Sequence, residues 1–158
     1  MVSFQFYIAN TAVHFEEASQ LIREYANSLG IDLSFQNFSA EIQDLPTIYS
    51  PPTGAMILVF NNGVAAGCAG VRQWSKDIGE LKRMYVRPNH RKAGVGFALL
   101  DRCISEARRL HYNRLRLDTL AGMTSAQSLY LKKGFYEIPP YRPNPIPGTL
   151  FFELNLSG

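Results

Sequence analysis

A short glycine-rich turn at the start of a long amphipathic helix constrains the fold of this chain more than any other feature. The helix is predicted over residues 93–110, where apolar residues recur at helical spacing. Gly94 and Gly96 allow backbone N–H groups to converge on an anion without obstruction by a Cβ atom. The helix N-terminus contributes a partial positive charge, and Arg91 and Lys92 add full charges beside it. A pyrophosphate would fit this turn.

Three interpretations compete for the turn. A dinucleotide-binding fold would place a third glycine where the sequence has Leu99, and only Asp118, at a plausible distance, supports it. A phosphate loop of the nucleotide triphosphatase kind needs Gly-Lys followed by Ser or Thr, which the sequence lacks. The third interpretation is a tight turn into a helix with no ligand. Two alternating glycines alone do not decide among them.

The other segments predict a mixed α/β sheet with helices on both faces, in one domain that spans residues 1–158. Strands are expected at residues 4–9, 55–60, 64–74, 81–86, 115–119, 135–138 and 149–156, and helices at 18–29, 35–45, 93–110 and 125–133. Strand 81–86, the long helix and strand 115–119 follow the order of a βαβ unit, so these two strands should run parallel.

Two loops without regular structure are expected near a binding site. Prolines and Gly54 predict an extended loop at residues 46–54 that could border a cleft. A second loop, residues 139–147, is rich in proline and therefore stiff, and it could shape an acceptor pocket.

Charge, cysteines and hydropathy limit the functional class. The net charge is 16 − 13 = +3, too small a surplus to indicate nucleic-acid binding, yet ten of the sixteen basic residues fall within residues 82–116. Cys68 and Cys103 lie in an expected strand and on an apolar helix face, which favours two buried free thiols. The N-terminal residues lack a signal-peptide pattern, and the longest apolar run, Ala55–Phe60, is too short to span a bilayer. We therefore expect a cytoplasmic protein.

From Glu80 onward the chain resembles the GNAT superfamily of N-acetyltransferases. The pyrophosphate signature of that family is Arg or Gln, two residues, Gly, any residue, then Gly or Ala, and Arg91, Gly94 and Gly96 match it. The strand end Met84–Val86 looks like the CoA-contacting strand of the family. Residues of a later helix and the start of the next strand also match, namely Leu129, Tyr130, Lys133, Gly134 and Phe135. The resemblance is close over residues 79–138.

The resemblance implies a GNAT-like fold of about six or seven mostly antiparallel strands, with a central splayed parallel pair and about four helices. It also implies that the strand ending at Met84–Val86 is bulged and diverges from residues 115–119, so that pantetheine pairs with the freed backbone. Backbone donors near Tyr85 and Val86 would stabilise the oxyanion. The residues implied to bind acetyl-CoA are Met84, Tyr85, Val86, Arg91, Lys92, Ala93, Gly94, Val95 and Gly96.

Two residues are candidates for acid–base catalysis. Glu80 matches the position where many GNAT enzymes place a general base, although a structural ion pair with a neighbouring Arg or Lys is an equally weighted alternative. Tyr130 lies in the LY motif of the family and would protonate the leaving CoA thiolate. Many members carry an Asn ahead of this helix, where this chain has Met123; Thr124 or Ser125 could substitute for that contact, or the contact could be absent, and we do not assign it.

The function implied is transfer of an acetyl group from acetyl-CoA to a primary amine of a small molecule by direct attack in a ternary complex. Arg72, Arg116, Tyr141 and Arg142 could surround the cleft and suit a carboxylate-bearing amine such as an amino acid, although surface or sheet-face packing is the favoured interpretation. The alternatives are a protein Lys or N-terminal acetyltransferase and a non-catalytic acyl-CoA sensor.

We expect a small-molecule amine as the partner, no nucleic acid, no membrane, and a monomer or homodimer. We expect no metal, because the three histidines are isolated from other ligand-type residues.

Overall fold

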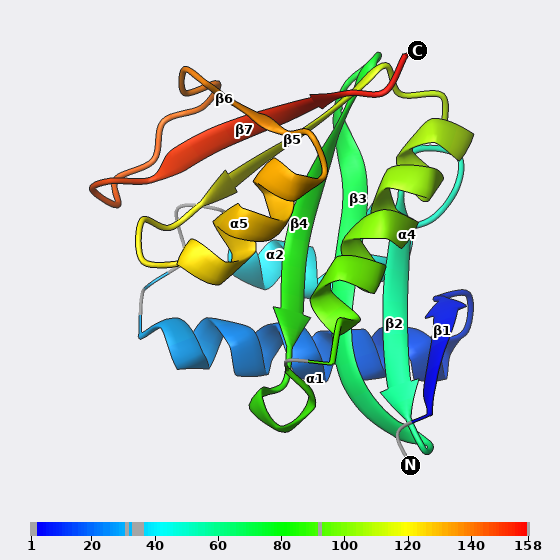
Figure 1. Ribbon diagram of the computed structural model, residues 1–158. Helices are drawn as coiled ribbons and strands as arrows, with labels where there is room; N and C mark the ends of the chain where they lie inside the picture. The colour runs from blue at the N-terminus through cyan, green and yellow to red at the C-terminus, as the bar shows by residue number, and fades with distance from the viewer. Residues whose placement is uncertain (1–2, 31, 33–36, 92, 158) are drawn as a thin grey trace.

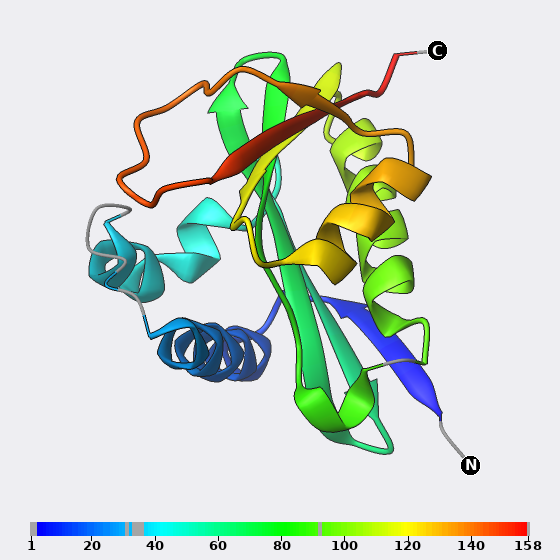
Figure 2. The same ribbon diagram turned by 60° about the vertical axis from the view of Figure 1, so that its left-hand side comes forward.

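A seven-stranded sheet lies between two layers of helices (Figures 1 and 2). The computed structural model describes residues 3–30, 32, 37–91 and 93–157. The strand order is β1-β2-β3-β4-β5-β7-β6, and of these neighbours only β4 and β5 run parallel. The strands are β1 (Phe4–Ile8), β2 (Ala55–Asn61), β3 (Val64–Ser75), β4 (Ile78–Val86), β5 (Arg114–Thr119), β6 (Tyr136–Ile138) and β7 (Leu150–Asn155).

Helices cover both faces of the sheet. They are α1 (Ala12–Leu29), α2 (Phe38–Gln43), α3 (Leu45–Ile48), α4 (Val95–Arg109) and α5 (Thr124–Lys132), with a short 3-10 turn at Pro88–His90. The nearly edge-on view shows α4 and α5 on one side of the sheet and α1 and α2 on the other (Figure 2). Each side buries its own apolar core, one built around α4 and one around α1.

The two cysteines belong to different cores. Cys103 of α4 packs in the first core and Cys68 of β3 in the second, both with no exposed surface and both as free thiols. Burial raises the pKa of the Cys68 thiol to about 12. The predicted free, buried thiols are therefore confirmed.

The predicted mixed sheet with a parallel βαβ pair is confirmed, and the differences lie in the connections. The expected loop 46–54 begins inside α3, where Pro46 fits the first turn because its missing N–H has no partner there in any helix. The expected helix at 35–45 ends at Gln43, and residues 33–36 lie outside the described part of the chain. Helix α4 begins at Val95 because Gly94 adopts a left-handed conformation, with φ of 77°.

Strands β4 and β5 pair over a short distance and then separate. Their register joins Ile78 to Arg114 and Glu80 to Arg116, and no further pairs follow. Beyond these pairs the two strands diverge as a V (Figure 1). The implied splay of the parallel pair is thus present, and it opens a cleft in the middle of the sheet.

Candidate active site

A β-bulge changes the direction of β4 near the point where the strand separates from β5. Between the paired residues Lys82 and Tyr85, β4 advances three residues while β3 advances two, from Gly70 to Cys68. Arg83 occupies the bulge with φ of 59°, an uncommon conformation for a residue with a side chain. The implied bulge is therefore present, and it frees backbone groups of β4 from the ladder with β3.

The cleft between the diverging strands is a cavity of about 980 Å³. Its walls come from α1, the end of β4, the turn before α4, the end of β5 and the start of α5. Eight of the residues predicted from the sequence line it: Met84, Tyr85, Val86, Arg91, Gly94, Val95, Gly96 and Tyr130. Ala93 is exposed beside it, and Lys92 lies outside the described residues. Segments far apart in the sequence thus meet around one cavity.

The turn at the start of α4, residues 94–96, lines one part of the cavity. Gly94 is the N-cap of α4, and its φ of 77° is one that an L residue adopts only with strain. A Cβ on Gly96 would lie 3.2 Å from Leu129 Cδ1, so glycine here also lets α4 approach α5. The N–H groups of a first helical turn have no partner within the helix, so this turn suits an anion.

Arg91 is held against the end of β4. Its Nε donates to the carbonyl oxygen of Val86 at 2.8 Å, and its guanidinium lies 5.9 Å from the centroid of the Tyr85 ring. These contacts fix a positive charge at the rim of the cavity, beside the glycine turn. The arrangement places a full charge and helix-terminal amides at the same end of the cleft.

Tyr130 reaches the cavity from α5. Its ring packs against Phe135 and Phe152, with centroids 5.7 and 6.3 Å away, and only 6% of the residue is exposed. Burial raises the pKa of its hydroxyl, and nearby Tyr25 and Asp118 act in the same direction. Tyr130 therefore keeps its proton near neutral pH and can act as a proton donor.

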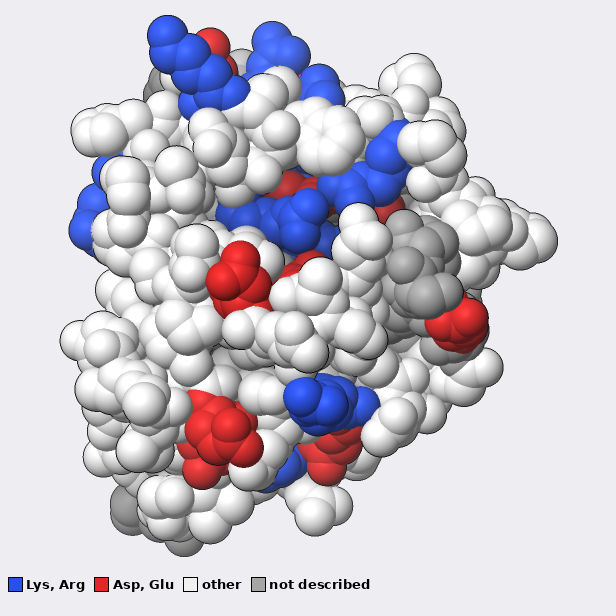
Figure 3. Space-filling model, turned by 180° about the vertical axis from the view of Figure 1, so that it is seen from behind, with Lys and Arg blue, Asp and Glu red and all other residues white. Residues whose placement is uncertain are grey.

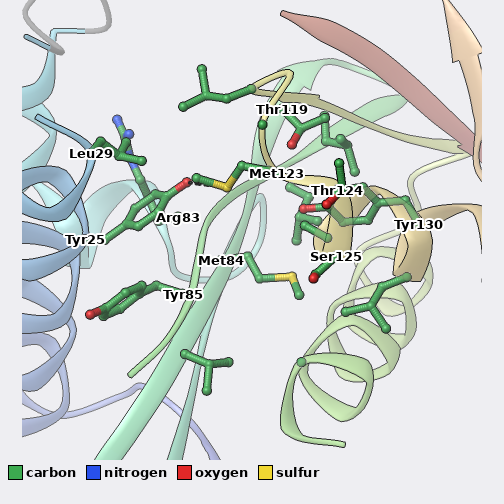
Figure 4. A pocket seen from close by; sticks show the side chains of 18 of the residues that line it. Tyr25, Leu29, Arg83, Met84, Tyr85, Thr119, Met123, Thr124, Ser125 and Tyr130 are labelled. Carbon is green, nitrogen blue, oxygen red and sulfur yellow. Dashed lines mark hydrogen bonds between the residues drawn. The ribbon is translucent and has the colours of Figure 1, made fainter. Parts of the chain in front are cut away.

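A contact between α1 and the start of α5 crosses the pocket. The hydroxyl of Tyr25 donates to Sδ of Met123 at 3.9 Å, and the close-up shows these side chains reaching each other from opposite walls (Figure 4). The Tyr25 ring also lies 5.3 Å from the ring of Tyr85. Thr124 and Ser125, the other candidates for the contact made by Asn in the family, line the same cavity. The sequence predicted the helix of Tyr25 but not its place at this site.

Glu80 lies in a row of alternating charges that crosses the sheet. The register sets Arg72 of β3 beside Glu80, Glu80 beside Arg116, and Arg116 beside Glu153 of β7. Arg72 Nε lies 3.5 Å from Glu80 Oε1, and Arg116 Nε donates to Glu153 Oε2 at 2.7 Å. Tyr136 of β6 completes the row by donating to Glu153 Oε1 at 2.5 Å. This row spans the point where β4 and β5 begin to separate.

The loop before β7 covers Glu80. Tyr141 donates its hydroxyl to Glu80 Oε2 at 2.7 Å, and Arg142 forms an ion pair with the same oxygen. Arg142 also stacks over Trp74, with 4.6 Å between the guanidinium and the ring centroid. Glu80 has no exposed surface and is not among the described residues that line the cavity. These contacts match the ion-pair alternative, and the role of Glu80 as a base stays a prediction.

The four residues considered for acceptor binding, Arg72, Arg116, Tyr141 and Arg142, therefore contact Glu80 or Glu153 and are absent from the described cavity wall. From the rear of the molecule, basic side chains gather in a hollow near the middle of the face, with acidic atoms visible among them (Figure 3). This pattern is the one expected of paired charges on a sheet face.

Two charged residues follow this row and do line the cavity. Lys82 lies two residues beyond Glu80 on β4, and Asp118 lies two residues beyond Arg116 on β5, so strand alternation places both on the same face. Burial lowers the pKa of Lys82, opposed by the charges of Glu80 and Asp118. Asp118 Oδ2 is buried and accepts no hydrogen bond from the described residues. The period-two spacing on two parallel strands was the signal that could have revealed this pair.

A buried ion pair holds the bulge on the same face of the sheet, where Arg72 contacts both Glu80 and Glu41. Arg83 donates from Nε and Nη2 to the two carboxylate oxygens of Glu41 at 2.7 and 3.1 Å. Tyr49 donates to Glu41 Oε2 at 2.9 Å. Burial alone would raise the pKa of Glu41, but the hydrogen bonds and charge of Arg83 outweigh it and lower the pKa. Helix α2 is thereby tied to β4 at the cavity wall.

The described residues contain no group of three or more His, Cys, Asp or Glu side chains placed to hold a metal ion. None of the helices in the described part of the chain combines the length and the apolar character that crossing a membrane requires.

Comparison with known proteins gives concordant matches. The family model described as "Acetyltransferase (GNAT) family" matches residues 17–135. An uncharacterized N-acetyltransferase of Schizosaccharomyces pombe is 35% identical over 144 residues, which cover 90% of this chain and 88% of that protein.

Solved structures agree with the fold. A GNAT-family acetyltransferase of Staphylococcus aureus superposes with a TM-score of 0.81 at 23% identity, covering 98% of this chain and all of that one. The yncA protein of Salmonella typhimurium, solved with its cofactor acetyl-CoA, superposes with a TM-score of 0.69 at 19% identity, covering 98% and 94% of the two chains.

Proposed function

Because the chain belongs to the acetyltransferase (GNAT) family, we propose that it transfers an acetyl group from acetyl-CoA to the primary amine of a small molecule. Membership of this family makes the chain an acetyl-CoA-dependent acyltransferase. One observation carries the proposal: a single cavity joins the glycine turn, the diverging strands and Tyr130. The coenzyme and the acceptor amine would meet in this cavity and react directly.

The glycine turn is the proposed binding site for the pyrophosphate of the coenzyme. The amides of residues 94–96 and the charge of Arg91 lie at one end of the cavity. The end of β4, Met84–Val86, lines the path from that turn towards the interior of the cleft. Pantetheine would follow this strand, and the backbone groups freed near Tyr85 and Val86 would polarise the acetyl carbonyl.

The environment of Tyr130 supports its role as general acid. Burial keeps the hydroxyl protonated, and the residue lines the cavity from α5. In this role Tyr130 would protonate the CoA thiolate as the carbon–sulfur bond breaks.

The charges of the cavity favour an acceptor that bears a carboxylate. Lys82, Arg83 and Arg91 are the basic side chains of the described wall, and Lys82 lies beside the diverging strands, away from the glycine turn. Among small amines, an amino acid carries a carboxylate beside its amino group. We therefore propose an amino acid or a related carboxylate-bearing amine as the acceptor.

Release of CoA thiol from acetyl-CoA, measured with a panel of amino acids, polyamines and aminoglycosides, tests this function. We expect turnover with at least one amino acid and little with polyamines. The methyl ester of the active amino acid is the matched comparison, and loss of its carboxylate charge should raise KM roughly tenfold, equivalent to ~1.4 kcal/mol. Calorimetric binding of CoA without turnover on any amine would contradict the proposal and indicate an acyl-CoA sensor.

A further inference from the structure

Asp118 is the one carboxylate among the described residues that line the cavity. Its Oδ2 is buried and accepts no hydrogen bond from any residue that the structure describes. A buried carboxylate oxygen without a donor is unfavourable, because the lost hydration is not replaced. Asp118 as a residue is half-buried and lines the cavity, so its carboxylate is placed to receive a donor from a ligand there.

The position of Asp118 follows from the fork between β4 and β5. Glu80 and Arg116 form the last pair before the strands separate, and Asp118 lies two residues further along β5 on the same face. It is therefore on the diverging part of β5, across the cavity from the end of β4 that pantetheine is proposed to follow. The neighbouring residue on β7 is Phe151, which offers no hydrogen-bond donor in its side chain.

The charged and titratable groups that act on Asp118 come from four elements. The charge of Asp118 raises the pKa of each of these groups, which are Lys82 of β4, Tyr25 of α1, Tyr130 of α5 and Tyr141 of the loop before β7. The charge of Asp118 in turn opposes the lowering of the Lys82 pKa by burial. Tyr130, the proposed acid, is part of the same group.

Glu80 is not among the described residues that line the cavity, although its Oε1, like Asp118 Oδ2, is buried and accepts no hydrogen bond from the described residues. Its Oε2 already accepts from Tyr141 and Arg142, its Oε1 lies 3.5 Å from Arg72, and none of its surface is exposed. Arg72, Tyr141 and Arg142 hold this carboxylate away from the described cavity wall. The two carboxylates on this face thus differ in what remains available to a ligand.

We infer that Asp118 binds the ammonium group of the acceptor and accepts its proton, which makes it the general base of the reaction. The inference rests on the proposed function and extends it by naming the group that activates the amine. An alkylammonium titrates near pH ~10, so an amine must lose a proton before it can attack at neutral pH.

The ammonium nitrogen of the acceptor carries three protons. One passes to Asp118 and then to water, and one remains in the product amide. The amine lone pair forms the C–N bond to the thioester carbonyl carbon, and the C–S bond breaks with its electron pair on sulfur. Tyr130 gives its proton to that thiolate and regains one from the nitrogen, which loses its third proton. The products are the N-acetyl compound, CoA as thiol and one proton.

The test compares Asp118→Asn with the native protein, using the best amino acid of the panel and acetyl-CoA. At pH 7 the variant should lose roughly 100-fold or more in kcat/KM, as expected when a general base is removed. Its rate should then rise about tenfold per pH unit up to the pKa of the acceptor amine, because only the neutral amine still reacts. CoA affinity, measured by calorimetry, should stay within about twofold, and Asp118→Glu should recover part of the activity.

Two variants make the result specific. Asp77→Asn makes the same chemical change in an exposed turn and should match the native protein in rate and pH profile. Glu80→Gln tests the rival carboxylate: a pH-dependent loss in that variant, with Asp118→Asn behaving as native, would overturn the inference and leave the acetyltransferase function intact. Absence of turnover by the native protein on the whole panel would overturn the proposed function, and the role of Asp118 with it.

Discussion

Burial sets the protonation of individual side chains in the cleft. Tyr130 is kept protonated because its hydroxyl is removed from water, while burial of Lys82 weakens its hold on a proton. The effects have opposite direction because the neutral form of each group is the one favoured by a nonpolar environment. Burial in one cavity thus favours the neutral form of both side chains, which is the protonated hydroxyl of Tyr130 and the deprotonated amine of Lys82.

Replacement of Tyr130 by Phe removes the proposed proton donor while keeping the ring that packs on Phe135 and Phe152. We expect kcat to fall roughly 100-fold, with little change in CoA affinity. Steady-state thiol release and calorimetry provide the two measurements. Tyr7→Phe, at an exposed position on β1, is the matched control and should behave as native. Native turnover by Tyr130→Phe would remove this residue from the mechanism.

The turn that begins α4 shows how an element depends on one backbone conformation. Gly94 has open space around it, so its requirement for glycine comes from φ alone. Because the N–H groups of the first helical turn follow from that conformation, a change at Gly94 alters the direction in which they point. The proposed binding site for the coenzyme pyrophosphate therefore depends on the conformation of the whole turn.

Gly94→Ala should weaken CoA binding about tenfold, because the turn can relieve the roughly 1–2 kcal/mol cost of a left-handed L residue only by changing the direction of the first N–H groups of α4. The measurement is calorimetric titration with CoA. Gly63→Ala places the same kind of strain, at φ of 83°, in the hairpin between β2 and β3 and should lower stability without altering CoA affinity. Equal CoA affinity for native protein and Gly94→Ala would contradict the assigned turn.

The sequence was sufficient to predict most elements, because strand and helix periodicities are local. The strands around Asn62 and Gly63 and the helix after Gly94 were placed within a few residues. The environment of Glu80 was not predictable, since Tyr141 reaches it from a loop 61 residues away in the chain. The same reason hid the place of Asp118 at the site, which depends on the register between β4 and β5.

At the scale of the whole molecule, buried ion pairs connect the elements that surround the cleft. Glu41 ties α2 to the bulge of β4 through Arg83, with Arg72 of β3 as a second partner at 3.2 Å. Glu153 connects β7 to Arg116 of β5. Both carboxyl groups have lowered pKa values, because hydrogen bonds and cations outweigh burial: those of Arg83 at Glu41, and the Tyr136 hydroxyl followed by Arg116 at Glu153. The two sides of the fork are thereby held by charges on one face of the sheet, and Arg72 links the two groups because it contacts both Glu41 and Glu80.

Glu41→Gln should lower the free energy of unfolding by roughly 3 kcal/mol at pH 7, because it leaves the buried cation of Arg83 without its charge partner. The lowered pKa of Glu41 in the folded protein means that its contribution is complete above the unfolded value, near pH ~4.3, and is lost as pH falls through the folded value. The difference between native protein and variant should therefore shrink in acid.

Denaturant unfolding at several pH values measures this difference. Glu24→Gln breaks the partly exposed pair with Arg87 and is the matched control, for which we expect a loss below ~1 kcal/mol. A difference between native protein and Glu41→Gln that stays constant from neutral to acid pH would show that the carboxylate charge of Glu41 does not stabilise the fold.

Both cysteines are sealed within the folded chain, Cys68 on the side of α1 and Cys103 on the side of α4. A chromogenic disulfide reagent added to native protein will therefore find neither sulfur accessible, and colour that develops during turnover will come from the coenzyme alone. Denatured chains will each consume two equivalents of the reagent. One dye can thus count catalytic events and, from its initial burst, the fraction of molecules that have lost their structure.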